Sequence, residues 1–559
     1  MRAAYERIRV ADRPEVWISL RPEADALADA ERVDAAVGLP LAGTIVAVKD
    51  NIDVAGLATT AGCPAFAYEP EETAPAVKRL LDAGAVVIGK TNLDQFATGL
   101  VGTRSPYGAV RNAWDPELVA GGSSSGSAVA VALGMADIGV GTDTAGSGRI
   151  PAAFQGIVGL KPTRGTISTL GVVPACRSYD CVSVFARTIA EAEQAVALMT
   201  GRADGDPFQR DWPADAPLGA PAAPAVAVPL PGQLGELPDG WAEAFEHAVG
   251  RLAEAGARVV PVDVSAFLQG ADLLYGTALV AERYAAVGAF VEAHPGEVDP
   301  SVAAIVLAAR DVRAHELVRD RERVEWTRLA ALAALAGADA LLLPTAPEHP
   351  TIAAVEADPL ARNLRLGRFA SFANLFDMCA LAVPASGGAA SFGVTVFAPP
   401  FHDRIAADIA RMLSGEPARP AGGEPAGVSL LVLGAHLSGQ PLNHQLLAHG
   451  GRFLRAASTR PLYRMFALDT VPAKPGLLHV GAAGARVEGE LWLLPPGGLG
   501  AFLALLPAPM TLGAVQLEDG TQVTGFFCQA SATAGAADIS AFGGWRAYLA
   551  SLQTAGAAR

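Results

Sequence analysis

Two short segments place serines among glycines, and they hold the residues of this chain best suited to nucleophilic chemistry. Residues 121–127 read GGSSSGS, and residues 142–151 read TDTAGSGRIP. Glycine lets a loop turn sharply and approach a ligand closely, and a serine hydroxyl can attack a carbonyl once a base takes its proton. The first histidine in the chain is His247, so these segments alone do not supply a Ser-His-Asp triad.

We expect the base to be Lys49, which follows an apolar run at residues 44–48. That run predicts a short buried strand, with the lysine at its end. Burial disfavours the ammonium form and lowers a lysine pKa, by up to about 3–5 units when the side chain is fully buried. A neutral amine could take a proton from one serine, which takes one from the next. The sequence therefore predicts a Lys–Ser–Ser relay that activates a serine nucleophile.

The elements that must position this relay alternate along the chain. Residues 1–30 predict an N-terminal helical segment that precedes the sheet. Further strands are predicted at residues 85–88 and 137–141, and helices at 74–83, 125–135, 241–255 and 310–335. This alternation is typical of an α/β fold, in which helices cover a sheet.

The composition of the chain and its hydrophobic pattern change near residue 415. Residues 415–427 read GEPARPAGGEPAG, a composition typical of a linker. Short strand-like runs follow, beginning at residues 428–433, with turns such as the Glu-Asp-Gly at 518–520. We expect a first domain at residues 1–414, a linker at 415–427 and a separate α+β domain at 428–559. A chain of 559 residues is long enough for two or three domains.

Composition narrows the classes of partner. The formal net charge is −15, which disfavours nucleic acid or an anionic membrane as a general partner but leaves room for a small anion held by one local arginine. The N-terminus lacks a signal-peptide core, and the long uncharged stretches at 378–401 and 491–517 are broken by proline and glycine. We therefore expect a cytoplasmic enzyme.

Cofactor and metal motifs are not found in the sequence. It has no phosphate-binding loop and no metal-ligand spacing, so no cofactor and no metal are implied. The five cysteines are odd in number and scattered, which does not suggest a disulfide framework.

Several motifs together resemble the amidase signature family. Lys49, Ser123 and Ser147 match that family's lysine, bridging serine and nucleophilic serine. The resemblance covers about residues 30–410 and includes GKTNLDQF at 89–96, GLKPT at 159–163 and LPTAP at 343–347, in the family's order. It implies the amidase signature fold, a large mixed sheet between helical layers. It also implies that Ser147 attacks an amide carbonyl while Ser123 passes protons between Ser147 and Lys49.

The same resemblance implies the surroundings of the nucleophile. The peptide bond before Ser123 should be cis, and backbone N–H groups of residues 144–147 should form an oxyanion hole. Gly122, Thr144, Ala145 and Gly146 are therefore expected at the substrate. Ala145 stands where the family usually has glycine, and we expect its methyl group to point away from the site.

A candidate for substrate recognition lies at residues 274–284. Tyr275 and Arg283 are eight residues apart, about two helical turns, so one helix could present both to one pocket. An arginine fork binds a carboxylate in bidentate fashion, although the spacing alone favours a surface arginine paired with Glu282 or with solvent. The segment resembles the corresponding region of allophanate hydrolases, where a tyrosine and an arginine at this spacing hold the substrate. By this resemblance the carboxylate of allophanate meets Arg283 and its terminal amide faces Ser147.

The C-terminal segment GAHLSGQPLNHQL at 434–446 resembles the second domain of the same family. That domain is associated with decarboxylating the product, N-carboxycarbamate. It also looks distantly like the γ-glutamylcyclotransferase fold, but Gly434 stands at that fold's tyrosine and its catalytic glutamate is not found. We expect chemistry there from His436 and His444, because a histidine pKa of about 6.5 suits proton transfer; a structural role fits each histidine equally.

Other amidases of the family remain as alternatives. These are a broad aliphatic or aryl amidase and the glutamine-hydrolysing component of a tRNA-dependent amidotransferase. The C-terminal domain and the Tyr275–Arg283 pair favour an allophanate hydrolase. No biotin-type or ATP-grasp region is present, so another chain would make the substrate, either a urea carboxylase or a route from cyanuric acid. The family tends toward dimers, so we expect a homodimer.

Overall fold

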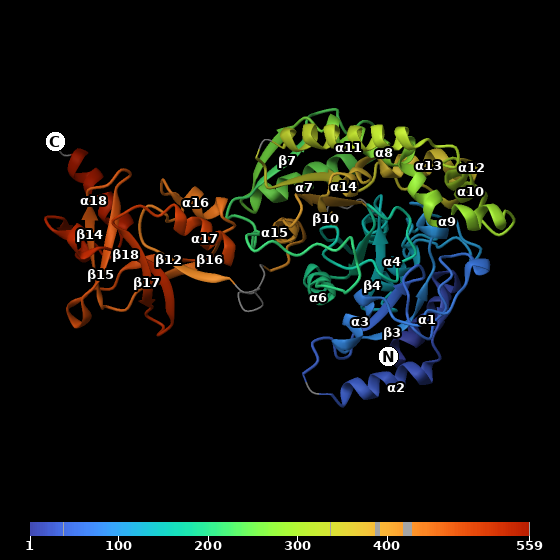
Figure 1. Ribbon diagram of the computed structural model, residues 1–559, viewed down its shortest axis with the longest axis horizontal. Helices are drawn as coiled ribbons and strands as arrows, with labels where there is room; N and C mark the ends of the chain where they lie inside the picture. Colours follow the sequence, from blue (N-terminus) through green and yellow to red (C-terminus); the bar gives the residue numbers. More distant parts are fainter. Residues whose placement is uncertain (37, 336, 386–391, 418–426, 558–559) are drawn as a thin grey trace. The chain divides into compact units, whose positions relative to one another are not determined.

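The computed structural model describes residues 1–36, 38–335, 337–385, 392–417 and 427–557. The chain divides into two units (Figure 1). The first unit is Met1–Asp211 with Pro224–Ala418, and the second is Trp212–Ala223 with Arg419–Arg559. The expected linker at 415–427 falls mostly on residues 418–426, which lie outside the described residues.

The first unit is built on one mixed eleven-stranded sheet. Its strands, in spatial order, are β1 (Trp17–Leu20), β3 (Val86–Thr91), β2 (Ile45–Lys49), β4 (Ile138–Asp143), β6 (Cys181–Ala186), β5 (Val158–Lys161), β10 (Cys379–Pro384), β11 (Gly393–Ala398), β9 (Ala340–Pro344), β7 (Ala225–Pro229) and β8 (Arg258–Val262). Strands β3, β2 and β4 are parallel, as are β9, β7 and β8, and the other pairings are antiparallel.

Helices cover this sheet in layers (Figure 1). Helices α4 and α5 pack together against β4 and β10, while α6 and α15 pack together with α3 and α7. The helices of the first unit are α1 (Arg2–Ala11), α2 (Glu23–Asp34), α3 (Pro75–Asp82), α4 (Ser125–Ala132), α5 (Ile150–Gln155), α6 (Ile189–Met199), α7 (Trp241–Glu254), α8 (Ser265–Gly276), α9 (Ala281–Ala293), α10 (Pro300–Leu307), α11 (Ala314–Ala334), α12 (Ile352–Ala357), α13 (Pro359–Leu366), α14 (Phe372–Leu375) and α15 (Asp403–Ser414).

The N-terminal segment at residues 1–30 differs from the expectation. Helices α1 and α2 form, but the edge strand β1 lies between them and pairs antiparallel with β3. Its four residues, WISL, are too few for a period of two to stand out from the flanking helical patterns.

The parallel strands β3, β2 and β4 deliver three loops to one edge of the sheet. Every residue of these strands is buried, because helices or loops cover both faces, which is why they read as continuous apolar runs. The carboxyl ends of neighbouring parallel strands meet at the same edge. The chain after β3, the end of β2 at Lys49 and the chain after β4 therefore lie close together.

The second unit has its own sheets and core. A five-stranded sheet has the order β13 (Arg452–Ser458), β16 (Glu488–Leu494), β12 (Val428–Val432), β18 (Gln522–Cys528) and β17 (Met510–Gln516). A three-stranded sheet has the order β15 (Lys474–His479), β14 (Tyr463–Leu468) and β19 (Ala537–Asp538). The helices are α16 (Asn443–Ala448), α17 (Pro496–Ala504) and α18 (Trp545–Ala557). Buried Leu430, Tyr463, Trp492 and Phe502 belong to its core.

The segment Trp212–Ala223 belongs to this second unit although it lies within the first in sequence. Ala214 accepts a hydrogen bond from the Gly497 N–H at 3.1 Å, and the Leu218 N–H donates to the Gly450 carbonyl at 3.4 Å. Leu218 is buried. The sequence did not predict this arrangement, because a run rich in alanine and proline carries no periodicity.

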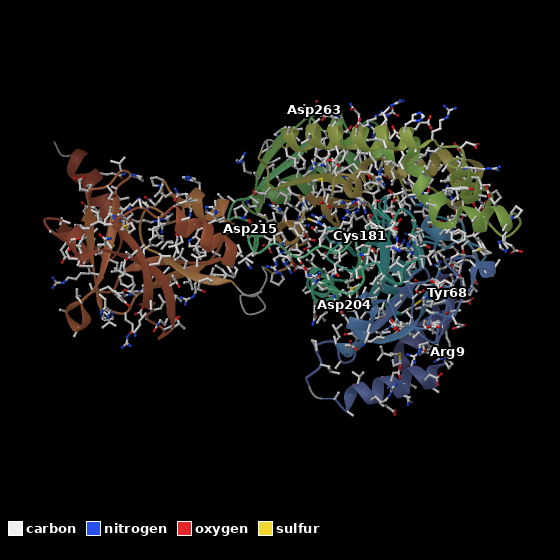
Figure 2. The ribbon with its side chains drawn as sticks, viewed as in Figure 1. Arg9, Tyr68, Cys181, Asp204, Asp215 and Asp263 are labelled. Atoms are coloured by element: carbon white, nitrogen blue, oxygen red, sulfur yellow. The ribbon has the colours of Figure 1, made fainter. Side chains whose placement is uncertain are left out.

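All five cysteines are unpaired and buried, among them Cys181 on β6 (Figure 2). No helix in the described ranges is both long and apolar enough to cross a membrane. Within the same ranges, no three His, Cys, Asp or Glu side chains gather as a metal site would require.

Candidate active site

The three relay side chains meet at the carboxyl ends of β2 and β4. Lys49 Nζ donates to Ser123 Oγ at 2.7 Å, and Ser123 Oγ donates to Ser147 Oγ at 3.1 Å. None of the three residues is more than 3% exposed. The peptide bond between Gly122 and Ser123 is cis, as the family resemblance implied. The contacts form a continuous path from the lysine nitrogen to the second serine oxygen.

Burial lowers the pKa of Lys49 to about 7. The carboxylates of Asp94, Asp143 and Asp180 oppose this shift by stabilising the ammonium form. The amine is therefore neutral in a large fraction of molecules near neutral pH. A proton acceptor with a pKa near the working pH is the most effective kind of general base.

A second hydroxyl orients the lysine. Lys49 Nζ donates to Thr142 Oγ1 at 2.8 Å, and Asn51 Nδ2 donates to the same oxygen at 3.3 Å. A neutral amine has two N–H donors and one lone pair. If one N–H is held by Thr142, the lone pair can face Ser123 and accept its proton. Sequence reasoning missed Thr142, although it lies within the quoted segment 142–151.

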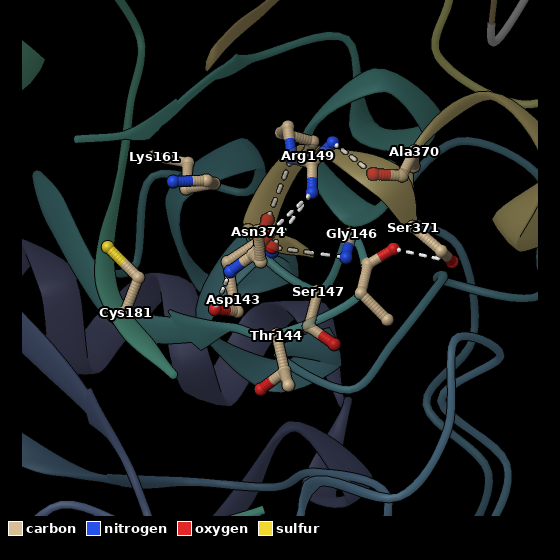
Figure 3. A network of polar contacts seen from close by, with 12 residues as sticks. Asp143, Thr144, Gly146, Ser147, Arg149, Lys161, Cys181, Ala370, Ser371 and Asn374 are labelled. Atoms are coloured by element: carbon tan, nitrogen blue, oxygen red, sulfur yellow. Dashed lines mark hydrogen bonds and ion pairs between the residues drawn. The ribbon is translucent and has the colours of Figure 1, made fainter. Parts of the chain in front are cut away.

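The loop that carries Ser147 is braced by a buried ion pair (Figure 3). Arg149 Nε and Nη2 each donate to the Asp143 carboxylate at 2.9 Å. The same carboxylate accepts the N–H groups of Gly146 at 3.1 Å and Gly148 at 2.9 Å. Because Asp143 and Arg149 are both fully buried, their geometry fixes the course of the loop on either side of the nucleophile.

The backbone donors near Ser147 differ in one respect from the expectation. The Gly146 N–H donates to Asp143, so it is not free to meet an oxyanion. The N–H groups of Thr144, Ala145 and Ser147 make no hydrogen bond to any residue that the structure describes. Gly146 is needed for its backbone instead: its φ is +135°, and a Cβ there would lie 2.9 Å from the Ala370 Cβ.

Ala145 fits its position. Its φ lies outside the left-handed region, so a side chain there is not strained. Its carbonyl accepts a hydrogen bond from Ser371 Oγ at 3.0 Å. The methyl group of Ala145 therefore adds no backbone strain at this position.

Two further polar residues support this loop and were not found from the sequence. Thr144 Oγ1 donates to Asp180 Oδ1 at 2.6 Å, and Asn374 Nδ2 donates to the Asp143 and Tyr179 carbonyls at 2.7 and 2.8 Å. Asp180 and Asn374 reach the site from distant segments. Their only sequence signal is that polar side chains stand beside strands that are otherwise apolar.

The predicted pairing of Tyr275 with Arg283 is found, but not on one helix. Helix α8 ends at Gly276, Thr277 is extended, and a 3₁₀ turn at Ala278–Val280 precedes α9. Arg283 Nη2 donates to the Tyr275 hydroxyl at 3.2 Å, and its Cζ lies 4.9 Å from the centre of the tyrosine ring. The expected two helical turns are broken because the extended Thr277 caps the 3₁₀ turn with its own hydroxyl.

Arg283 is a buried cation. It is 2% exposed, and its Nη1 donates to Thr98 Oγ1 at 2.9 Å. Within the described ranges, no carboxylate oxygen lies within ion-pairing distance of it. Glu282, the partner expected of a surface arginine, pairs with Arg321 at 2.9 Å instead. The guanidinium therefore has hydroxyl partners but no direct ion pair among the described residues; the buried carboxylate of Asp180 interacts with it only electrostatically, at longer range.

The second unit holds a cavity of about 240 Å³. His436, Gln445 and Lys474 supply its polar lining, and the apolar lining includes Phe502 and Phe526. His436 Nε2 contacts Gln445 Oε1 at 3.0 Å, and its ring stacks on Phe526. Burial, aided by the positive charge of Lys474, lowers the pKa of His436, so its ring is neutral at physiological pH.

The structure separates the two histidines expected in the C-terminal domain. His444 is exposed and is not among the residues that line the cavity. Its Nδ1 contacts the Pro441 carbonyl at 2.9 Å, a contact made within its own turn. Of the two histidines, His436 is therefore the one that lines the cavity, with Lys474 as its cationic neighbour.

The fold and this serine–lysine site place the chain in the amidase family. Residues 1–405 match the family model described as Amidase, and residues 428–550 match the model of the allophanate hydrolase C-terminal domain. The chain thus belongs to the amidase family and combines both of these domains. The expected amidase signature fold and the smaller second domain are confirmed; the likeness to the cyclotransferase fold stays a prediction.

Several solved structures and curated proteins are similar to this chain. A Kluyveromyces lactis allophanate hydrolase is 36% identical and matches with a TM-score of 0.84, over 99% of this chain and 97% of that chain. The urea amidolyase of Saccharomyces cerevisiae is 38% identical over 92% of this chain but 30% of its own length. A glutamyl-tRNA(Gln) amidotransferase chain of Thermotoga maritima is 29% identical, with a TM-score of 0.63, over 76% of this chain and 94% of that chain. This chain spans about a third of the curated urea amidolyases.

Proposed function

We propose that this protein hydrolyses the terminal amide of allophanate to ammonia and N-carboxycarbamate through an acyl-enzyme on Ser147. The observation that carries the proposal is Arg283, a buried guanidinium that makes no direct ion pair with any described residue of the unit that holds the Lys–Ser–Ser relay. A buried cation is costly without an anionic partner, and allophanate brings a carboxylate. The similarity to an allophanate hydrolase over nearly the whole length of both chains supports this choice.

The relay geometry defines the steps. Ser147 Oγ attacks the terminal carbonyl, and its proton passes through Ser123 to the neutral amine of Lys49. The free N–H groups of the Thr144–Ser147 loop stabilise the oxyanion that forms. When the intermediate collapses, the leaving ammonia takes a proton back from Lys49 through Ser123. Water then attacks the acyl-enzyme by the same proton path and releases N-carboxycarbamate.

The alternative within the family is hydrolysis of glutamine or a simple amide, since the similar glutamyl-tRNA(Gln) amidotransferase chain matches the first domain. Ammonia release by the purified protein from allophanate, glutamine and acetamide separates the two. We expect turnover of allophanate to exceed that of both others by orders of magnitude. Preferred hydrolysis of glutamine would overturn the proposal.

Replacing Arg283 by methionine tests how the carboxylate is recognised. Because a charge-assisted hydrogen bond contributes about 1.5–3 kcal/mol, we expect the KM for allophanate to rise about 10- to 100-fold, with a smaller change in kcat. Steady-state ammonia release measures both constants. Arg321→Met is the control, because Arg321 is an exposed neighbour that pairs with Glu282; an unchanged KM in Arg283→Met would contradict the assignment.

We propose that the second unit promotes loss of carbon dioxide from N-carboxycarbamate at the His436 cavity. The dianion takes up one proton and divides into carbon dioxide and carbamate. The carbamate anion then takes up a second proton and divides into carbon dioxide and ammonia. Lys474 offers a cation for one carboxylate. Neutral His436 is positioned to relay the proton, and the apolar wall favours conversion of an anion into neutral carbon dioxide.

The two histidines of this unit make a matched test in the full-length protein. We expect His436→Asn to leave the rate of the first ammonia release unchanged and to lower the initial carbon dioxide release toward the uncatalysed rate. His444→Asn should change neither, because His444 lies outside the cavity. Parallel assays of ammonia and carbon dioxide on allophanate measure this. Equal carbon dioxide rates in all three proteins would remove the cavity from the mechanism.

We further propose a cytoplasmic homodimer that works downstream of a urea carboxylase. The similarity to urea amidolyases, of which this chain spans 30% and 31%, supports the link to a carboxylating partner. Small anionic allophanate is then the only partner that the first site itself must recognise.

A further inference from the structure

We propose that Thr98 is a positioning residue for Arg283 and that it sets the preference of the site for an anionic over a neutral amide. The inference rests on the proposed function, because it concerns how the same guanidinium meets the substrate carboxylate. It is carried by the contacts of Thr98 and by the strained turn that presents it.

The Thr98 side chain is arranged as an acceptor for the guanidinium. Thr98 is 1% exposed. Its hydroxyl donates to the Phe96 carbonyl at 3.2 Å, so an oxygen lone pair is left for Arg283 Nη1 at 2.9 Å. The hydroxyl has one proton to give, and the structure directs it away from the arginine.

Together Thr98 and Tyr275 fix the plane of the guanidinium. Thr98 takes an N–H of Nη1 and Tyr275 takes an N–H of Nη2, so both terminal nitrogens are held. Three of the five N–H donors of Arg283 have no partner among the residues that the structure describes and remain for a ligand. A planar fork held at two points offers these donors to a planar carboxylate in one orientation.

The backbone before Thr98 is strained in order to present it. Phe96 and Ala97 have φ values of 50° and 53°, in the left-handed region that side chains rarely adopt. Such residues cost free energy and persist where the surrounding structure over-determines them, commonly at functional sites. Here buried Arg104 holds the turn, because its Nη1 donates to the Thr98 carbonyl at 2.9 Å.

The same loop is tied to the relay. It follows β3, the neighbour of β2. The Asp94 N–H donates to the carbonyl of Ser123 at 3.3 Å, and the Asp94 carboxylate accepts the N–H groups of Gly102 and Arg104 at 3.0 Å each. One loop therefore contacts the bridging serine at one point and orients Arg283 at another. It holds the spacing between the nucleophile and the anion-binding group, which a short rigid substrate must match.

The test compares allophanate with biuret, in which an amide replaces the carboxylate. Thr98→Val removes the acceptor oxygen at nearly constant volume, Thr98→Ala removes it without a new methyl contact, and Thr98→Ser retains it. Biuret is followed as a substrate or, if turnover is slow, as a competitive inhibitor of allophanate hydrolysis. Thr166→Val is the matched control, because Thr166 is also buried and its hydroxyl donates to a backbone carbonyl, that of Thr163.

We expect Thr98→Val and Thr98→Ala to raise the KM for allophanate about tenfold or more, since a buried charged donor loses its partner. We expect kcat to change less than KM, the constants for biuret to stay within about twofold and Thr98→Ser to restore the wild-type preference. Thr166→Val should leave the ratio of the two substrates unchanged.

Two results would overturn the inference. One is an unchanged allophanate-to-biuret preference in both Thr98→Val and Thr98→Ala, and the other is an equal loss on both substrates, which would mark a structural role alone. Arg283→Met separates this from the proposed function. If that variant also keeps the preference, the carboxylate assignment itself fails, whereas if it loses the preference and the Thr98 variants do not, only the role of Thr98 fails.

Discussion

Replacing Ser147 by alanine abolishes hydrolysis of allophanate, with an expected fall in kcat of about 10⁵-fold or more, as for other enzymes that lose a serine nucleophile. The reason is that no acyl-enzyme can form without its oxygen. The fold should be unaffected, because the loop is held by the Asp143–Arg149 pair and, among the described residues, the Ser147 hydroxyl contacts only Ser123. Ammonia release at saturating allophanate measures the loss, and thermal unfolding checks the fold.

Ser125→Ala is the matched control for this variant. Ser125 lies in the same serine-rich segment and is equally buried, but its hydroxyl contacts the Asn92 carbonyl and not the relay. We expect Ser125→Ala to keep most of the wild-type activity, and we expect a serine-directed fluorophosphonate to label this control but not Ser147→Ala. More than about 1% residual activity in Ser147→Ala would refute the nucleophile assignment.

Replacing Lys49 by methionine should lower kcat/KM by about 10³-fold or more, because a general base and its proton path are both lost. The wild-type pH profile gives a second, sharper readout. Since the pKa of Lys49 is about 7 and the working form is the neutral amine, activity should fall about tenfold per unit of pH below 7 and level off above it. Lys49→Met keeps the length of the side chain without a titrating nitrogen.

The pH dependence distinguishes a catalytic lysine from a structural one. In Lys49→Met, the rise of residual activity through pH 7 should disappear, because no group is left to deprotonate there. Steady-state assays from about pH 5.5 to 9 on both proteins measure this. If the variant keeps the wild-type midpoint, or more than a few per cent of the rate at neutral pH, Lys49 is not the base.

The relay could be predicted from the sequence because its chemistry restricts both residue type and context. Few arrangements let a serine act without a histidine, and Lys49 stands directly after an apolar run that had to be a strand. The supporting residues could not be predicted in this way. Thr98 and Asp180 act through partners that lie far away in sequence, and nothing local marks a threonine whose role is to hold an arginine.

Local sequence patterns also gave incomplete predictions where two structures fit the same pattern and only tertiary packing decides between them. Tyr275 and Arg283 fit one helix by spacing, yet the extended Thr277 divides it and still brings them together. His436 and His444 are the same residue type in one short segment, and only the packing against Phe526 shows which one faces a cavity. The strand β1 was missed because four residues are too short to show a period.

Because Trp212–Ala223 belongs to the second unit, both units are discontinuous in sequence rather than joined end to end. The backbone passes from the first unit to the second after residue 211, returns at residue 224, and passes over again after residue 418. A single cut by a protease between residues 415 and 427 should therefore leave the two fragments associated. The C-terminal fragment still packs on Trp212–Ala223, which stays covalently attached to the first unit. A gene fusion or truncation that exchanges the second unit at about residue 418 would leave Trp212–Ala223 in the first unit without the residues on which it packs.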